Sequence, residues 1–385
     1  MKAALFTPTP YVGPSERGRW PVPVQTYSRE AAEKSMEDSL AQFQLADEAG
    51  FDWVTLAEHH YAPFSLTPNP MVMAGAVSQR VKRAKIALLG MNIPTINPVR
   101  TAEEFAMLDT MTGGRVIAGM LRGTSNEYVT YNTNPSESFE RFREALALIL
   151  KTWTEPQPFG WQGRYFEYRA ISIWPRPVQQ PHPPVYMSGS SPESGEFAAR
   201  NRIKLGFAVT TLDLATKASR YYRSIANEAG WDPAPDDIIY RVGIQVAETD
   251  EQAREAAATA GPGRGITQTR EPGQAPVARA VGFATSNMSV DDAVARAGYY
   301  GRDVDNQRGR VRMGGEVEQR IENGQILCGS PDSILRQAQR VHDEVGAGVL
   351  DLVFGGEPQH ALRSIELFGT RVLPRLHQID GAHPK

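Results

Sequence analysis

The sequence has 385 residues, of which 41% are hydrophobic and 22% are charged, and its net charge is −3. This balance is typical of a globular enzyme and gives no electrostatic reason to expect nucleic acid or an anionic membrane as a partner. The single cysteine, Cys328, excludes an internal disulfide and a cysteine-based metal site, and because no apolar stretch is long enough for a signal peptide or a membrane span, we expect a cytoplasmic protein.

Segments with strand character alternate with segments of helical periodicity along the chain. Strands are predicted at residues 2–10 (running into a proline-rich loop), 51–58, 84–94, 115–121, 183–189, 204–211, 238–249 and 349–355. Helices are predicted at residues 28–50, 70–80, 97–114, 137–153, 191–201, 214–230, 330–346 and 358–376. Strands that alternate with helices in this way predict a parallel (β/α)8 barrel, the TIM barrel, so we expect residues 1–385 to form one α/β domain.

Two stretches depart from the repeat. Residues 154–183 are rich in proline and aromatic residues and are predicted to be an insertion. Residues 261–329 are rich in glycine and arginine and form a long excursion between the seventh strand and the helix before the eighth. Loops of this length are usually lids or binding surfaces, and we expect a lid at residues 301–326; an insertion without a role is the alternative.

Polar residues collect at the C-terminal ends of the predicted strands, where barrel enzymes place their active sites. They follow strands two to five, and they are Glu58, His59, His60, Gly90, Asn92, Arg122, Gly123, Thr124, Ser190, Ser191 and Ser194. We therefore expect the site at this end of the barrel.

The serines after the fifth strand lie at the start of a predicted helix. Hydroxyls, free backbone N–H groups and the positive end of a helix dipole together form a phosphate site, and Arg122 on the neighbouring strand supplies a charged partner. The alternative is that Ser190, Ser191 and Ser194 only cap the helix, because serine is a favoured N-cap residue. Because Arg122 lies on the neighbouring strand, the phosphate site is the favoured interpretation.

Gly90 interrupts an otherwise bulky strand. A glycine inside a strand usually marks either a bulge or a ligand that lies against the backbone. Asn92 shares the face of Gly90 by the two-residue period of a strand. Both explanations stay open from the sequence alone.

Three interpretations of His59 and His60 compete. Zinc binding is disfavoured, because adjacent residues on a strand point to opposite faces and no second cluster of ligands is present. In the second interpretation, one or both histidines are hydrogen-bonded core residues. In the third, one histidine acts as a general acid or base beside a cofactor, a role for which an imidazole is suited at neutral pH.

Several ordered blocks of the sequence resemble the bacterial luciferase-like, flavin-dependent monooxygenases. They are GFDWVTLAEHHYAPFSLTPNP (residues 50–70), PTINPVRTAEEFAMLDTMTGGRVIAGMLRG (94–123), PPVYMSGSSPESGEFAARN (183–201), CGSPDSILRQAQRV (328–341) and LDLVFGG (350–356). The resemblance implies a (β/α)8 barrel that binds reduced FMN from a separate NAD(P)H-dependent flavin reductase and activates molecular oxygen as a C4a-(hydro)peroxyflavin. It also implies a homodimer and oxygenation of an organic, apolar substrate, by hydroxylation or by Baeyer–Villiger-type oxygen insertion.

The resemblance also implies roles for single residues. His59 corresponds to the catalytic histidine of the family, His60 to its neighbour, and Glu58 to the acid that precedes both. Gly90 corresponds to a small residue against the flavin ring, often at a cis peptide, so the bond from Leu89 to Gly90 is a candidate for a cis bond that would cost about 3–4 kcal/mol. The phosphate shell corresponds to Arg122, Ser190, Ser191 and Ser194, Thr124 to the residue whose main chain supports it, and Arg141 is a further phosphate candidate. The other cofactor-binding candidates are Glu58, Gly90, Asn92 and Gly123.

The sequence departs from luciferase at two points. Leu121 stands where the luciferase alpha chain has a reactive cysteine, which argues against a light-emitting enzyme, and Ser190 stands where luciferase has an acidic residue. Two other functions remain open: a barrel dehydrogenase that uses the deazaflavin F420, and a catalytically silent flavin-binding partner subunit. The insertion aromatics, Trp161, Tyr165, Phe166, Tyr168 and Trp174, either shape an apolar pocket or cover the barrel.

Overall fold

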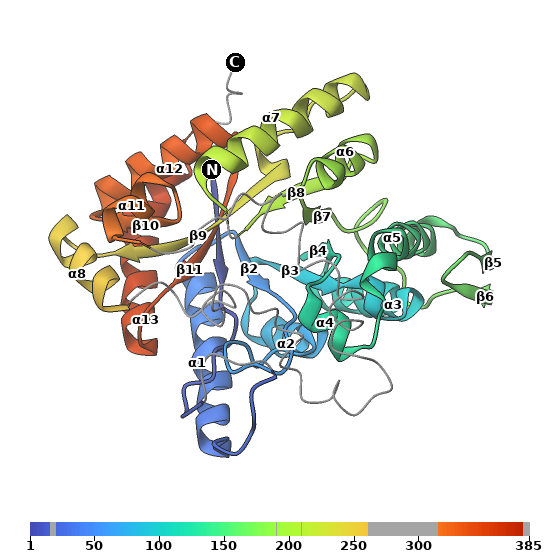
Figure 1. The fold of residues 1–385 in the computed structure, drawn as a ribbon, viewed down its shortest axis with the longest axis horizontal. Helices are drawn as coiled ribbons and strands as arrows, with labels where there is room; N and C mark the ends of the chain where they lie inside the picture. The colour runs from blue at the N-terminus through green and yellow to red at the C-terminus, as the bar shows by residue number, and fades with distance from the viewer. Residues whose placement is uncertain (16–20, 190, 209, 261–314, 380–385) are drawn as a thin grey trace.

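The computed structural model of the protein describes residues 1–15, 21–189, 191–208, 210–260 and 315–379, and Figure 1 shows their arrangement. The strands are β1 (Lys2–Phe6), β2 (Trp53–Leu56), β3 (Lys85–Asn92), β4 (Val116–Leu121), β5 (Phe159–Gln162), β6 (Glu167–Ile171), β7 (Val185–Ser188), β8 (Lys204–Phe207), β9 (Ile238–Val246), β10 (Ile326–Gly329) and β11 (Val349–Phe354). Among the helices in these ranges, none has the length and apolar character needed to cross a membrane.

Eight of these strands form a closed parallel barrel. Each strand of the series β1, β2, β3, β4, β7, β8, β9 and β11 pairs with the next, and β11 pairs with β1 to close the ring. The members correspond one to one to the eight predicted strands, so the predicted (β/α)8 fold is confirmed.

The tenth strand is a departure from the prediction. β10 pairs with the C-terminal end of β9, from Gly243 to Val246, and it lies inside the stretch 261–329, the long excursion in which no strand was predicted. Ile326 and Cys328 of β10 pack against Ala253 and Ala257 of the preceding helix α8. β10 does not belong to the strand–helix repeat of the barrel, which is why the sequence pattern does not reveal this strand.

Helices cover the outer face of the barrel (Figure 1). The longer ones are α1 (Arg29–Glu48), α2 (Pro70–Arg80), α3 (Pro98–Thr112), α5 (Ser138–Thr154), α6 (Pro192–Arg200), α7 (Leu212–Glu228), α8 (Asp250–Ala260), α12 (Pro331–Val345) and α13 (Pro358–Leu367). Two shorter ones are α4 (Ser125–Thr130) and α11 (Val317–Glu322), and α14 (Leu373–Leu376) follows a π-helical turn at Phe368–Val372. Side-chain caps start several of them: Ser28, Asn69 and Asn97 each accept a hydrogen bond from the first turn.

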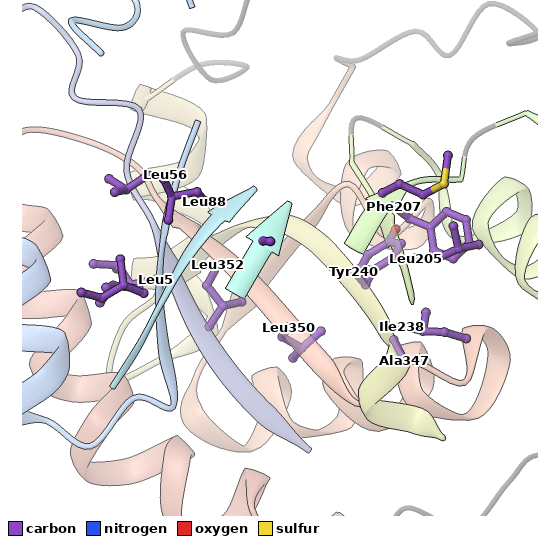
Figure 2. Close-up of a cluster of buried hydrophobic side chains, with 14 of the residues drawn as sticks. Leu5, Leu56, Leu88, Leu205, Phe207, Ile238, Tyr240, Ala347, Leu350 and Leu352 are labelled. Carbon is purple, nitrogen blue, oxygen red and sulfur yellow. The ribbon is translucent and has the colours of Figure 1, made fainter. Parts of the chain in front are cut away.

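The two faces of each barrel strand build two separate cores. Outward-facing side chains such as Leu5, Leu56, Leu88 and Leu352 pack under the helices, as Figure 2 shows. Inward-facing residues form a distinct cluster of Ala4, Trp53, Ala87, Ile117, Tyr186, Ile239 and Val349. This division follows from the two-residue period of a strand.

The insertion at 154–183 contains an antiparallel hairpin, β5–β6, which the sequence analysis did not predict. The carboxylate of Glu144 on α5 holds its turn, because it accepts hydrogen bonds from the backbone N–H groups of Arg164, Tyr165 and Phe166. Trp161, Phe166 and Tyr168 pack against the outer core, whereas Trp174 is 88% exposed. This packing favours the explanation that the insertion covers the barrel.

Residues 301–314 of the predicted lid lie outside the described residues. The remainder of that stretch includes α11, which contacts α8 through an ion pair between Glu318 and Arg254 with an N–O distance of 2.5 Å. This part of the predicted lid is attached to the barrel wall beside β10.

Candidate active site

A bulge brings the C-terminal ends of β2 and β3 close together. The pairing of β3 with β4 shifts register between Leu89 and Met91, and a Cβ atom on Gly90 would lie 2.5 Å from the Cα atom of Ala57. Only glycine permits this approach. The cis peptide bonds of the described residues precede Pro175 and Pro181, so the predicted cis bond between Leu89 and Gly90 is wrong, and the bulge is the explanation that the structure supports.

Glu58 connects the ends of these two strands. Its Oε2 atom accepts a hydrogen bond from the backbone N–H of Asn92 at 3.2 Å, and its Oε1 atom lies 3.0 Å from Nε2 of His60. Gly123, with φ of 90°, lets the loop after β4 pass directly beside the Asn92 side chain, where a Cβ atom would lie 3.4 Å from Oδ1. The ends of β2, β3 and β4 therefore form one continuous polar group.

The two histidines point to different partners. Nδ1 of His59 lies 3.4 Å from Oε1 of Glu127, and its side chain is 21% exposed. His60, with a side chain only 6% exposed, pairs with Glu58, and its ring packs edge-on against Tyr131 at 5.1 Å. β2 ends at Leu56, so both histidines lie in the loop beyond the strand. Strand alternation is therefore not the reason for their divergence; each pairs with its own carboxylate.

Glu127 is a site residue that the sequence analysis missed. It is 1% exposed on the short helix α4, and its Oε2 atom accepts hydrogen bonds from the backbone N–H (2.8 Å) and the hydroxyl of Thr124. Burial raises the pKa of this carboxyl group, but the hydrogen bonds from His59 and Thr124 outweigh burial, and the net pKa is lowered. The signal was present in the sequence, because Thr124 followed three residues later by Glu127 is a capping-box pattern.

One buried donor in this group has no acceptor. Asn92 is 3% exposed, and its Nδ2 atom makes no hydrogen bond to any residue that the structure describes. Buried amide donors are rarely left unsatisfied, because the desolvation penalty is about 1–3 kcal/mol. A flavin ring carries carbonyl and ring-nitrogen acceptors along one edge, so the donor at Asn92 fits such a group.

Thr124 of the predicted phosphate shell binds Glu127, whereas the described serines and Arg122 lie near α6. Ser191 caps α6, where its Oγ accepts a hydrogen bond from the backbone N–H of Ser194 at 3.3 Å and donates one to Oγ of Ser194 at 3.0 Å. Capping is therefore one role of Ser191, and Ser190 lies outside the described residues. The guanidinium of Arg122 lies 5.4 Å from the ring of Phe139, which in turn contacts Phe197 of α6 at 6.2 Å. Arg122 thus lies on the α6 side of the barrel mouth.

Arg141 is directed away from this group. Its Nε atom donates a hydrogen bond to the carbonyl oxygen of Pro94 at 3.2 Å, and its guanidinium lies over the rings of Tyr165 and Phe166. These partners, Pro94, Tyr165 and Phe166, do not belong to the predicted phosphate shell. Within the same ranges, no three His, Cys, Asp or Glu side chains are grouped to hold a metal ion.

The chain matches a known family over most of its length. A family model described as luciferase-like monooxygenase matches residues 18–350. The oxygenase component of the flavin-dependent trigonelline monooxygenase of Acinetobacter baylyi is 26% identical over 244 residues, which are 61% of this chain and 66% of that protein. The chain spans about half of the length of one curated relative that it matches and 66% of the trigonelline enzyme.

Solved structures share the fold along nearly the whole chain. The oxygenating constituent of the 3,6-diketocamphane monooxygenase of Pseudomonas putida, a type II Baeyer–Villiger enzyme in complex with FMN, superposes with a TM-score of 0.70 at 21% identity and covers 97% of this chain and 98% of that one. An F420-dependent secondary alcohol dehydrogenase in complex with an F420–acetone adduct superposes with a TM-score of 0.65 at 18% identity, covering 89% and 95%. At these identities the likeness shows the fold alone. The extent of the family match, together with the barrel, shows that the chain belongs to the luciferase-like monooxygenase family.

Proposed function

We propose that the protein is an FMNH2- and O2-dependent monooxygenase of the two-component type, which receives reduced FMN from a separate NAD(P)H-dependent flavin reductase and acts as a homodimer. Reduced flavin supplies the electrons that reduce oxygen, so that one oxygen atom enters an organic substrate and the other leaves as water. The observation that carries this proposal is the buried carboxylate of Glu127 against Nδ1 of His59, beside the unsatisfied amide of Asn92.

The catalytic role falls to His59. A carboxylate accepts the Nδ1–H hydrogen bond, which leaves Nε2 to accept or donate a proton on the open side of the ring. His60 and Glu58 are buried together and hold the loop after β2. His59 is therefore the residue that moves a proton at the reacting flavin and oxygen, and His60 supports the loop that positions it.

The cofactor would lie across the ends of β2, β3 and β4. The backbone at Gly90, the amide of Asn92 and the loop at Gly123 contact the flavin ring, with Glu58 holding Asn92 in place. The phosphate group binds Arg122, Thr124, Ser191 and Ser194 with the N-terminus of α6; Ser190 and Arg141 are further candidates.

An F420-dependent dehydrogenase is the second candidate, supported by the fold that the chain shares with the F420-dependent alcohol dehydrogenase. Equilibrium titration separates the two candidates. We expect reduced FMN to bind in the low micromolar range and reduced F420 to bind far more weakly. The reverse order of affinity, with hydride transfer that oxygen does not affect, would establish the dehydrogenase.

A further inference from the structure

A charged side chain lies inside the barrel, below the candidate active site. Along β9, Val242 and Ile244 face the outer core, whereas Ile239 belongs to the inward-facing cluster. Arg241 is two residues from Ile239 and therefore faces inward. Its strand neighbour in register is Asp351 of β11.

Buried partners fix the Arg241 side chain. Oδ2 of Asp351, which is 0% exposed, accepts a hydrogen bond from Nε of Arg241 at 2.6 Å, and Oδ1 accepts one from the hydroxyl of Thr55 at 2.7 Å. The guanidinium lies 3.8 Å from the centre of the Phe6 ring. Arg241 and Asp351 together carry no net charge, and these contacts hold the guanidinium in place.

The outer end of the guanidinium has no protein acceptor among the described residues. An arginine side chain has five N–H donors, and the hydrogen bond of Arg241 to Asp351 uses only the one at Nε. The side chain is 17% exposed, although it lies within the barrel. The two Nη groups are therefore the donors that an additional acceptor inside the barrel would satisfy.

These donors face the C-terminal mouth of the barrel. On the other side of Arg241, Ile239, Val349 and Tyr186 are at most 3% exposed and close the interior. Toward the mouth, the guanidinium lies over the ring of Phe6, which pairs with Val353, two residues nearer the C-terminal end of β11 than Asp351. Arg241 thus lies at the floor of the barrel lumen, below the strand ends at which Asn92 closes β3 and His59 follows β2.

We propose that Arg241 binds a neutral carbonyl oxygen at this floor, an inference that rests on the proposed function because it places a ligand in the same lumen. Asp351 already balances the arginine, so a second carboxylate would leave a net negative charge inside the barrel. A carbonyl oxygen satisfies the Nη donors without that charge. The carbonyl belongs either to the organic substrate or to the pyrimidine ring of the flavin.

Ligand-observed NMR titration with three small probes tests the proposal: cyclohexanone, methylenecyclohexane, which has the same shape without an acceptor, and cyclohexanecarboxylate. A hydrogen bond to a charged group contributes about 1.5–3 kcal/mol, so cyclohexanone should bind at least about tenfold more tightly than methylenecyclohexane. Tighter binding of the carboxylate than of the ketone would overturn the choice of a neutral ligand.

The variant that removes the subsite is the double substitution Arg241→Met with Asp351→Asn, which deletes both charges and keeps a hydrogen-bond partner for Thr55. Arg176→Met is the matched control, because that guanidinium binds the backbone carbonyls of Glu155 and Trp153 on the insertion side. The ketone preference should vanish in the double variant and persist in the control. Circular dichroism establishes that each variant is folded.

Titration with FMN and reduced FMN distinguishes the two sources of the carbonyl. If the double variant loses flavin affinity about tenfold and the wild type shows no ketone preference, the flavin supplies the carbonyl. If neither the ketone preference nor the flavin affinity depends on Arg241, the proposal is wrong. The ketone titration needs neither flavin nor oxygen, so its failure is separable from failure of the proposed function.

Discussion

The Oε1 atom of Glu127 lies 3.4 Å from Nδ1 of His59, and the pair joins the loop after β2 to the short helix after β4. Glu127 is almost completely buried and is held by Thr124 as well. A buried carboxylate that contacts one ring nitrogen determines which nitrogen carries the proton. The orientation and tautomer of His59 thus depend on a residue outside the histidine motif.

Replacement of Glu127 tests this dependence. In the wild type, nitrogen NMR should find neutral His59 protonated at Nδ1, because the carboxylate accepts that proton. Glu127→Ala should shift the population toward the Nε2–H form, whereas Glu127→Gln, which keeps an acceptor oxygen, should retain the wild-type form. An unchanged tautomer in the alanine variant would show that Glu127 does not set the proton position.

Arg122 is expected to recognise the phosphate of the flavin. Arg122→Ala should weaken binding of reduced FMN at least about tenfold, since a charge-assisted hydrogen bond contributes about 1.5–3 kcal/mol, and should leave binding of reduced riboflavin unchanged. Arg141→Ala is the comparison, because its partners among the described residues are Pro94, Glu137 and the hairpin aromatics. If Arg122→Ala weakened the binding of FMN and riboflavin equally, Arg122 would not recognise the phosphate. If Arg141→Ala weakened the binding of FMN alone, Arg141 would be the residue that recognises it.

The buried pair of Asp351 and Arg241 should make an asymmetric contribution to stability. Asp351→Ala leaves the arginine charge without its counter-ion, so the free energy of unfolding should fall by about 3–5 kcal/mol. Adding Arg241→Met should restore part of this loss, because no uncompensated charge then remains inside the barrel. Urea unfolding measures both values; an additive effect of the two substitutions would show that the side chains are not coupled.

Asp250 should contribute to stability only above acidic pH. Its carboxylate accepts hydrogen bonds from the backbone N–H of Ser330 and the hydroxyl of Ser333, which lower its pKa from 3.8 to about 2. Because the folded pKa lies below the unfolded value, the stabilisation is complete above about pH 4 and is lost as the pH falls toward about 2. The difference in unfolding free energy between wild type and Asp250→Asn should shrink over that range. A difference independent of pH would mean that ionisation of Asp250 plays no part.

Repetition made the barrel predictable. Predicted strands alternated with predicted helices around the whole barrel, so that even the four-residue strands β2, β7 and β8 were recognised by their place in the repeat. β10 and the β5–β6 hairpin were missed because they lie outside this repeat and because contacts distant in sequence, such as those of Glu144, hold the hairpin.

Site residues at strand ends were predictable for a similar reason, since parallel strands bring their C-terminal ends together. The positions of these residues relative to one another were not predictable. The bulge at Gly90 depends on the backbone of Ala57, a contact across strands, and the sequence alone left it open against a ligand. Arg241 was missed because its place on the inner face of β9 has meaning only once Asp351 is known to lie opposite.

The central claim is that His59 acts on reduced FMN and oxygen at the ends of β2, β3 and β4. Its most direct test is to mix the protein and reduced FMN rapidly with oxygenated buffer and to follow the visible absorbance of oxidised flavin, in wild type, His59→Ala and His60→Ala at saturating flavin. The account predicts a long delay before oxidised flavin appears in the wild type, a much shorter delay with release of hydrogen peroxide in His59→Ala, and a largely retained delay in His60→Ala. Immediate reoxidation in the wild type, or a delay that His59→Ala leaves unchanged, would contradict it.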